Sequence, residues 1–206
     1  MTRSLGVVFA VIPDLVTASL FVLCWIAPAW IGPGWIKSLM LLMVFEFVCI
    51  HATAFLMNLA MSDKMSRTKR SVGIVAIGFG YLGLAAAIAY AFGAWWPIIA
   101  FLWLLVGKLA IVWEQANKQR QRQQMLIWGI STGAYIVTVL AGVMIPVPAL
   151  MITDAVREAA ELTGSGLWVD HPERMIFSGL LYFCALSYVK YRVLRQAVSA
   201  QSPNSK

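Results

Sequence analysis

The chain has 206 residues, of which 61% are hydrophobic and only 12% are charged, and its mean hydropathy is +0.78. Soluble domains carry about a quarter charged and about half apolar residues, so this composition excludes an ordinary soluble domain. It also excludes a disordered chain and a small secreted module held by disulfides. What remains is a multi-pass membrane protein that forms one compact helical unit.

The charge balance is basic, with 16 Lys and Arg against 9 Asp and Glu. The basic residues stand in short segments between apolar runs, so we interpret the excess as a topology signal and expect no nucleic-acid partner. The three cysteines lie in apolar stretches and form no CxxC pair, which predicts neither a disulfide framework nor a metal site.

Six stretches are long and apolar enough to cross a bilayer, which needs about 20 residues per helix. Turn residues and tryptophans stand at their ends, as expected for helix boundaries and interfacial belts. We therefore expect an all-α protein with a six-transmembrane-helix bundle, as a single integral membrane domain over residues 1–206. The expected spans are 5–30, 35–61, 71–92, 95–113, 125–147 and 175–194, followed by a flexible cytoplasmic tail over 195–206.

The distribution of Lys and Arg predicts the orientation. Twelve of the 16 fall on one face of this arrangement, three fall on the other, and Lys108 lies within a span. Because cytoplasmic loops retain positive charge, we expect both termini in the cytoplasm and a location in the cell (inner) membrane. The alternative for the first segment is a cleavable signal peptide, since Arg3 and Ala27-Pro28-Ala29 imitate one; Asp14 and the length of the apolar run argue against it.

The longest connection runs from Pro148 to Arg174, between the fifth and sixth spans. Met151, Ala155, Ala159 and Leu162 share one helical stripe, which predicts a short amphipathic helix in this outer loop, with Gly164 as its stop. We expect it to lie on the surface of the bundle; a lid over an outward-facing cavity is the alternative.

Four ionisable side chains lie within the expected spans, where charge is costly and marks either function or a paired partner. At 1.5 Å per residue from the nearest tryptophan anchor, they lie between about 16 and about 24 Å deep. We therefore expect an intramembrane charged cluster of Asp14, Glu46, His51 and Lys108. Matched depth and opposite sign predict that Glu46 pairs with Lys108 and that His51 meets Asp14, either as structural pairs or in a functional site.

Small residues predict close helix packing in two spans. The third span carries Gly80 and Gly83 in a run of small residues, which fits a central helix, an oligomer contact or a narrow pore. Gly129 and Gly133 frame Ser131 in a G-x-S-x-G pattern. This pattern stands in an apolar helix rather than a strand-to-helix turn, so we interpret it as packing rather than as a nucleophile.

Cofactor signals are weak. Bis-histidine haem ligation needs two histidines at matching depth, whereas His51 is within a span and His171 is in the outer loop. Asp170-His171-Pro172-Glu173 is capable of metal binding but is more typical of a solvated loop. We expect no catalytic residues, no metal and no cofactor.

We expect one of two non-catalytic functions, with a membrane enzyme as the third alternative. The first is transport or permeation of a small ion or solute through a bundle that encloses the charged cluster. The second is a membrane partner or assembly protein, in which the charges are structural and the small-residue faces bind a homo-oligomer or another membrane protein. The lipid bilayer is the expected environment, and the basic loops can attract anionic headgroups.

Overall fold

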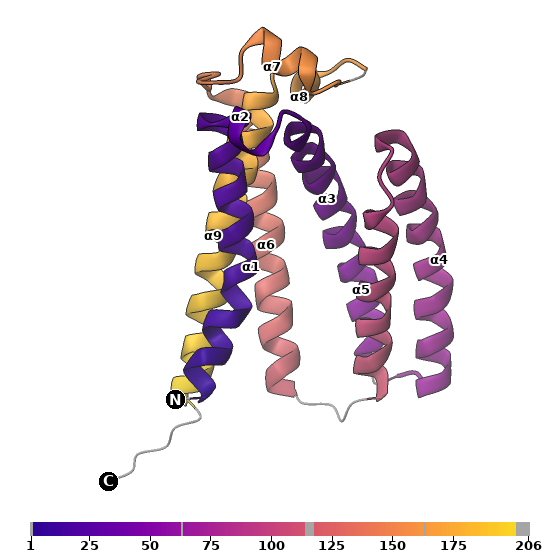
Figure 1. The fold of residues 1–206 in the computed structure, drawn as a ribbon. Coiled ribbons are helices and arrows are strands. Elements are labelled where there is room, and N and C mark those ends of the chain that lie inside the picture. The colour runs from indigo at the N-terminus through magenta and orange to yellow at the C-terminus, as the bar shows by residue number, and fades with distance from the viewer. Residues whose placement is uncertain (1, 63, 114–117, 163, 201–206) are drawn as a thin grey trace. The chain divides into compact units, whose positions relative to one another are not determined.

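The computed structural model describes residues 2–62, 64–113, 118–162 and 164–200, and the regular structure within these residues is helical (Figure 1). The long helices are α1 (Thr2–Ile26), α3 (Gly34–Ala60), α4 (Arg67–Phe92), α5 (Trp96–Trp113), α6 (Lys118–Met144) and α9 (Pro172–Ala200). Three short helices are α2 (Pro28–Ile31), α7 (Asp154–Ala159) and α8 (Leu167–Asp170). The all-helical expectation is confirmed.

Within the described residues, five helices are long and apolar enough to cross a membrane: α1, α3, α4, α5 and α6. These helices correspond to the first five expected spans and are consistent with a membrane-embedded protein. The sixth expected span lies in α9, which is not among the five because its second half carries Lys190, Arg192 and Arg195. A sixth span therefore stays a prediction.

Helix boundaries differ from the expected ones where local chemistry overrides the hydropathy pattern. The first expected span divides at Ala27, because the residue before Pro28 is driven away from helical backbone angles. Helix α4, which corresponds to the third expected span, starts earlier than expected, at Arg67. Ser66 caps it by accepting a hydrogen bond from the Lys69 N–H at 3.4 Å. Gly93 ends the same helix in the left-handed region, with φ of +66°.

The helix between the fifth and sixth expected spans is shorter than its apolar stripe suggested. Thr153 caps the start of α7 through its Oγ1, and the helix ends at Ala159. Glu161 then adopts a φ of +50°, so the chain leaves the helix before Leu162 and Gly164. The stripe is thus only partly helical, and its location outside the membrane stays a prediction.

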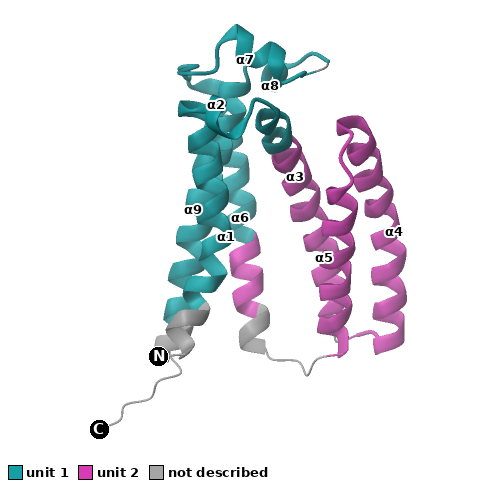
Figure 2. Ribbon diagram, viewed as in Figure 1, with its two compact units in different colours: residues 1–40, 129–206 teal, residues 41–128 magenta. Residues whose placement is uncertain are grey.

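Two compact units make up the chain (Figure 2). Unit 1 comprises residues 1–40 and 129–206, and unit 2 comprises residues 41–128. The division falls within α3 and α6, each of which contributes residues to both units. The expectation of a single membrane domain stays a prediction.

Unit 1 is organised by an antiparallel α1–α9 pair. Phe21 stacks on Phe183 with ring centroids 5.7 Å apart, and Trp25 meets Phe177 edge-on at 5.9 Å. A Cβ added to Gly179 would collide with the Phe21 ring, so the absence of a side chain lets the two helices approach closely. The two helices therefore pack through aromatic contacts and through the close approach of the Phe21 ring to Gly179.

Helix α6 approaches α9 closely at one point in unit 1. A Cβ at Gly142 would collide with Ser178 and with the Arg174 carbonyl, which marks the point of closest approach. The Arg174 guanidinium donates to the Val143 carbonyl at 2.7 Å and so satisfies an acceptor at the C-terminus of α6.

Unit 2 has an apolar core formed by α3, α4 and α5. Its fully buried members are Phe45, Ala52, Leu56, Ala60, Ile74, Ala85, Phe101 and Val112. A Cβ added to Gly78 would collide with Leu105, which places α4 close to α5. At the other end of this unit the Arg70 guanidinium donates to the Ala60 carbonyl at 2.8 Å, which ties the start of α4 to the end of α3.

Candidate functional site

Asp14 lies in the middle of α1, next to a proline that helix interiors rarely tolerate. Pro13 has no N–H to donate, which leaves one backbone acceptor of the preceding turn without its helical partner. The helix nevertheless continues through this position. The Thr17 hydroxyl donates a hydrogen bond to the Pro13 carbonyl at 2.9 Å. The Asp14 side chain is 8% exposed, so its charge requires a partner within the protein.

Lys190 of α9 is that partner. Its Nζ donates a hydrogen bond to Asp14 Oδ1 at 3.0 Å and lies 2.8 Å from Oδ2, so the ammonium neutralises the carboxylate. The Lys190 side chain is 29% exposed and reaches the pair along the α1–α9 interface. Sequence reasoning assigned Lys190 to the cytoplasmic charges and missed this contact.

Lys190 lies at nearly the same depth along α9 as Asp14 does along α1. Lys190 is 18 residues beyond the first residue of α9, or about 27 Å along the helix axis. That depth is close to the about 24 Å expected for Asp14. Charges of opposite sign at equal depth on antiparallel helices are natural partners within a membrane.

The other three charges expected in the membrane belong to unit 2. Glu46 on α3 and Lys108 on α5 are both half-buried, and their pairing stays a prediction. His51 is exposed; its Nδ1 lies 3.1 Å from the Phe47 carbonyl, and its ring lies against Phe47 with centroids 4.2 Å apart. A carbonyl only accepts hydrogen bonds, so Nδ1 is the donor in this contact.

Asp14 belongs to unit 1 and His51 to unit 2, so the expected contact between them stays a prediction. Asp14 is already neutralised by Lys190, and it therefore does not need His51 to be tolerated inside a membrane. The four expected residues thus divide into one charge with a defined partner and three charges in the other unit.

The expected packing glycines have open surroundings. An added Cβ at Gly80, Gly83, Gly129 or Gly133 meets no atom within 4 Å. The glycines that do admit a close neighbour are Gly73, Gly78, Gly142 and Gly179. Sequence reasoning did not separate these groups, because small residues recur along both sides of α4 and only packing reveals which side is filled.

Small residues form a continuous exposed stripe on α4. At 100° per residue, the members of this stripe fall within an arc of about 80° on one side of the helix. All of them are exposed, in a helix that is apolar enough to cross a membrane. We call this surface the α4 face; its members are Ala76, Gly80, Gly83, Ala87 and Ala91.

A buried carboxylate anchors the loop of unit 1 that carries α7 and α8. The Glu173 side chain is 5% exposed, and it accepts a hydrogen bond from the Arg157 guanidinium at 3.2 Å. His171 Nδ1 lies 3.1 Å from its other oxygen. Within the part of the chain that the structure describes, no group of three His, Cys, Asp or Glu side chains is arranged to hold a metal ion.

Ser131 of the G-x-S-x-G pattern lies inside α6, within a continuous helix. Its side chain is buried, and no strand-to-helix turn presents it. A nucleophile elbow requires that turn to expose the hydroxyl, so this serine does not have the geometry of a hydrolase nucleophile.

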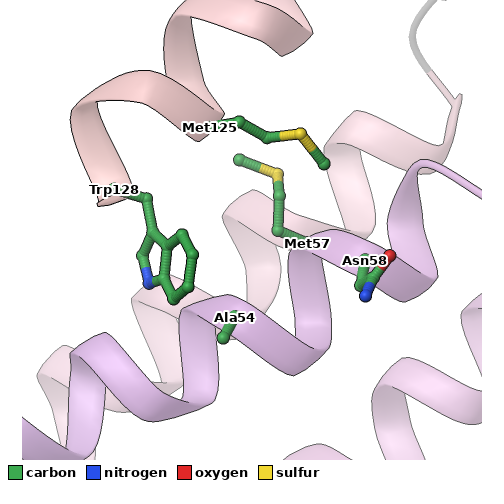
Figure 3. A pocket seen from close by; sticks show the side chains of 5 residues that line it. All are labelled: Ala54, Met57, Asn58, Met125 and Trp128. Carbon is green, nitrogen blue, oxygen red and sulfur yellow. The ribbon is translucent and has the colours of Figure 1, made fainter. Parts of the chain in front are cut away.

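A cavity in unit 2 was not expected from the sequence. It has a volume of about 210 Å³ and is lined by Ala54, Met57 and Asn58 of α3 and by Met125 and Trp128 of α6 (Figure 3). The Trp128 indole N–H donates to the Ile50 carbonyl at 3.0 Å, which fixes the ring beside α3. Ala54 and Asn58 belong to the same stripe of α3 as His51, and that shared stripe was the available sequence signal.

Comparison with known proteins finds no matching family model, no similar curated protein and no similar solved structure.

Proposed function

We propose that the chain is a multi-pass protein of the cell membrane, with six spans and both termini in the cytoplasm. Helix α9 is the sixth span. Its Lys190 is neutralised by Asp14, which reduces the cost of placing a lysine within the bilayer. The basic segments 64–70 and 118–122, together with the charged end of α9, lie on the cytoplasmic side in this arrangement.

We further propose that the protein has a non-catalytic role and assembles with another membrane protein through the α4 face. The observation that carries this proposal is the open space beside Gly80 and Gly83, on a helix long enough to span the membrane. Membrane helices associate through small residues because their backbones can then come close together. The partner that fits is a transmembrane helix with a small-residue stripe of its own.

Transport, the other function expected from the sequence, has less support. It requires a polar cavity that reaches the charged residues. Asp14 is instead packed and paired between α1 and α9, and the cavity described above is lined mainly by apolar side chains that do not include Glu46 or Lys108.

In-cell photo-crosslinking tests the assembly proposal. A photoreactive phenylalanine analogue replaces Phe79, which is 69% exposed and borders the α4 face. We expect a discrete crosslinked product that contains a second membrane protein. The same analogue at Trp103, an exposed residue of α5, is the control and should give no such product.

Matched glycine substitutions identify the surface responsible. The double variant Gly80→Leu/Gly83→Leu should abolish the product, because leucine side chains hold the backbones apart. Gly107→Leu on α5 is the matched control, since Gly107 is also exposed and an added Cβ there meets nothing within 4 Å. An undiminished product in the double variant, or a product confined to a single chain, would refute the proposal. A product that contains only two copies of this chain would assign the α4 face to self-association instead.

Cysteine accessibility tests transport separately. Single cysteines at positions 46 and 108, in a background without the three native cysteines, are treated from each side with a membrane-impermeant thiol reagent. Labelling from one side would show a water-filled path to the charged residues and would favour transport over assembly. The native cysteines to be removed are Cys24, Cys49 and Cys184.

A further inference from the structure

The cavity of unit 2 lies between the last turns of α3 and the first turns of α6. Met57 and Met125 face one another from the two helices, and the Trp128 ring lies against the α3 turn that carries Ala54 (Figure 3). Asn58 stands at one end of this group. All five lining residues belong to unit 2, so the cavity is a property of that unit alone.

The interior of the cavity suits a flexible hydrocarbon. Trp128 uses its only polar group to bond the Ile50 carbonyl, and it therefore presents an apolar ring to the cavity. The two methionine thioethers are unbranched and adapt to irregular apolar surfaces. The Asn58 side chain is exposed, so the mouth offers one polar group that can donate and accept hydrogen bonds.

The size of the cavity restricts what can occupy it. Pockets that hold a whole small-molecule ligand usually measure about 300–1,000 Å³, whereas this cavity measures about 210 Å³. It therefore accommodates one apolar portion of a ligand, while the remainder of the ligand lies outside. A cavity of this size is too small to enclose a whole solute and release it again.

Basic residues surround the end of unit 2 where the cavity lies. The hydrogen bond from Arg70 to the Ala60 carbonyl holds the first turn of α4 beside the end of α3, two residues after Asn58. On α6, Arg122 is exposed and precedes Met125 by three residues, or about 4.5 Å along the axis. The exposed cations at this end are Lys64, Arg67, Lys69 and Arg122.

Acidic residues are scarce in these segments. Residues 61–70 contain four basic residues and one acidic residue, and residues 118–125 contain three basic residues and no acidic residue. An apolar cavity with an amide at one end, close in sequence to several exposed cations, is complementary to a molecule with a hydrocarbon chain and an anionic head.

We propose that unit 2 binds an anionic phospholipid at this site. One acyl-chain segment lies between Met57, Met125 and Trp128. The phosphate accepts a hydrogen bond from the Asn58 carboxamide and is attracted by Arg122 and the basic turn of α4. The site therefore selects lipids by headgroup charge, and the partner is a component of the membrane rather than a dissolved solute.

Quenching of Trp128 by brominated lipids tests the proposal. The full chain is reconstituted in phosphatidylcholine nanodiscs that contain increasing fractions of phosphatidylglycerol brominated on its acyl chains. The chain has nine tryptophans, so the signal of Trp128 is taken as the difference between the parent protein and Trp128→Phe. We expect this signal to be half-quenched at a fraction of brominated phosphatidylglycerol at least fivefold lower than that of brominated phosphatidylcholine.

Trp103→Phe is the control for non-selective quenching. Trp103 is 79% exposed on α5, and the signal that this variant removes should respond equally to both lipids. If Trp128→Phe fails to fold, Met57→Phe replaces it: this variant fills the cavity, so the difference in total tryptophan quenching between the parent and Met57→Phe should appear at a lower fraction of brominated phosphatidylglycerol than of brominated phosphatidylcholine.

Charge variants test the headgroup contact. Arg122→Gln should raise the half-quenching fraction of phosphatidylglycerol about fivefold, which is the expected effect of one cation near an anionic lipid. Arg192→Gln, an exposed arginine of α9 in the other unit, should leave it unchanged.

Two results would overturn the proposal, namely equal quenching of Trp128 by the two lipids and no quenching by either. Reversal of the quenching by millimolar inorganic phosphate would also overturn it, because the site would then recognise a free anion rather than a lipid.

Discussion

The Asp14–Lys190 pair allows a quantitative prediction about unit 1. Asp14→Leu removes the carboxylate and leaves the Lys190 ammonium in the α1–α9 interface without its partner. Removing one member of a buried ion pair costs about 3–5 kcal/mol. Lys190 retains 29% of its side-chain exposure and can partly re-solvate its charge, so we expect a loss of about 2–3 kcal/mol.

The double variant Asp14→Leu/Lys190→Met should restore most of that loss. Apolar pairs of similar volume often replace buried ion pairs at little or no cost. We therefore expect the double variant to be within about 1 kcal/mol of the parent, which implies a coupling energy of about 2 kcal/mol between the two sites. Asp154→Leu is the control for the leucine substitution, since its side chain is fully exposed.

Equilibrium unfolding in mixed detergent micelles, followed by helical circular dichroism, measures these differences. The reasoning would be refuted if Asp14→Leu were as stable as the Asp154→Leu control. It would also be refuted if the double variant lost the sum of the two single effects, because the charges would then act independently of one another.

Two further predictions concern other contacts of unit 1. Gly179→Ala should lower the free energy of unfolding by about 1–2 kcal/mol, because its Cβ collides with the buried Phe21 ring. The same substitution at the open position Gly107 should raise the free energy of unfolding by up to about 1 kcal/mol, through helix propensity alone. Unfolding of the two variants in detergent measures whether the two changes have opposite sign. Glu173→Gln should weaken the anchor of α7, because it removes the charge that Arg157 contacts; we expect hydrogen exchange of the α7 amides to accelerate about five- to tenfold, which corresponds to about 1 kcal/mol, whereas the exposed control Glu158→Gln should leave the exchange unchanged.

The helices were predictable because their signals are local. A run of about 20 apolar residues between turn residues specifies a long helix without reference to the rest of the chain. The division at Ala27 and the early start at Arg67 were missed for the opposite reason. Each depends on one proline or one serine cap, whose effect on the backbone is greater than its effect on hydropathy.

The contacts of the site were less predictable because they depend on register between distant segments. Asp14 and Lys190 are 176 residues apart, and their contact follows only once α1 and α9 are known to be antiparallel neighbours. Gly179 and Gly83 are likewise indistinguishable by residue type. One faces a phenylalanine ring and the other faces open space, and only the packing of α9 against α1 assigns the difference.

Two groups of residues can be distinguished in the fold: those that contact another helix of the chain and those that are exposed. Lys190 and Gly179 are occupied by α1, so changes there should alter stability before they alter any association. Gly80, Gly83 and Asn58 are exposed, and an added Cβ at either glycine meets nothing within 4 Å in the described residues, so changes there should alter the proposed associations before they alter stability. The α4 face and the cavity of unit 2 are therefore the surfaces through which we propose that the protein binds components of the membrane. Because Lys190 neutralises Asp14 within the fold, this charge supports the proposed assembly role better than a conduction path.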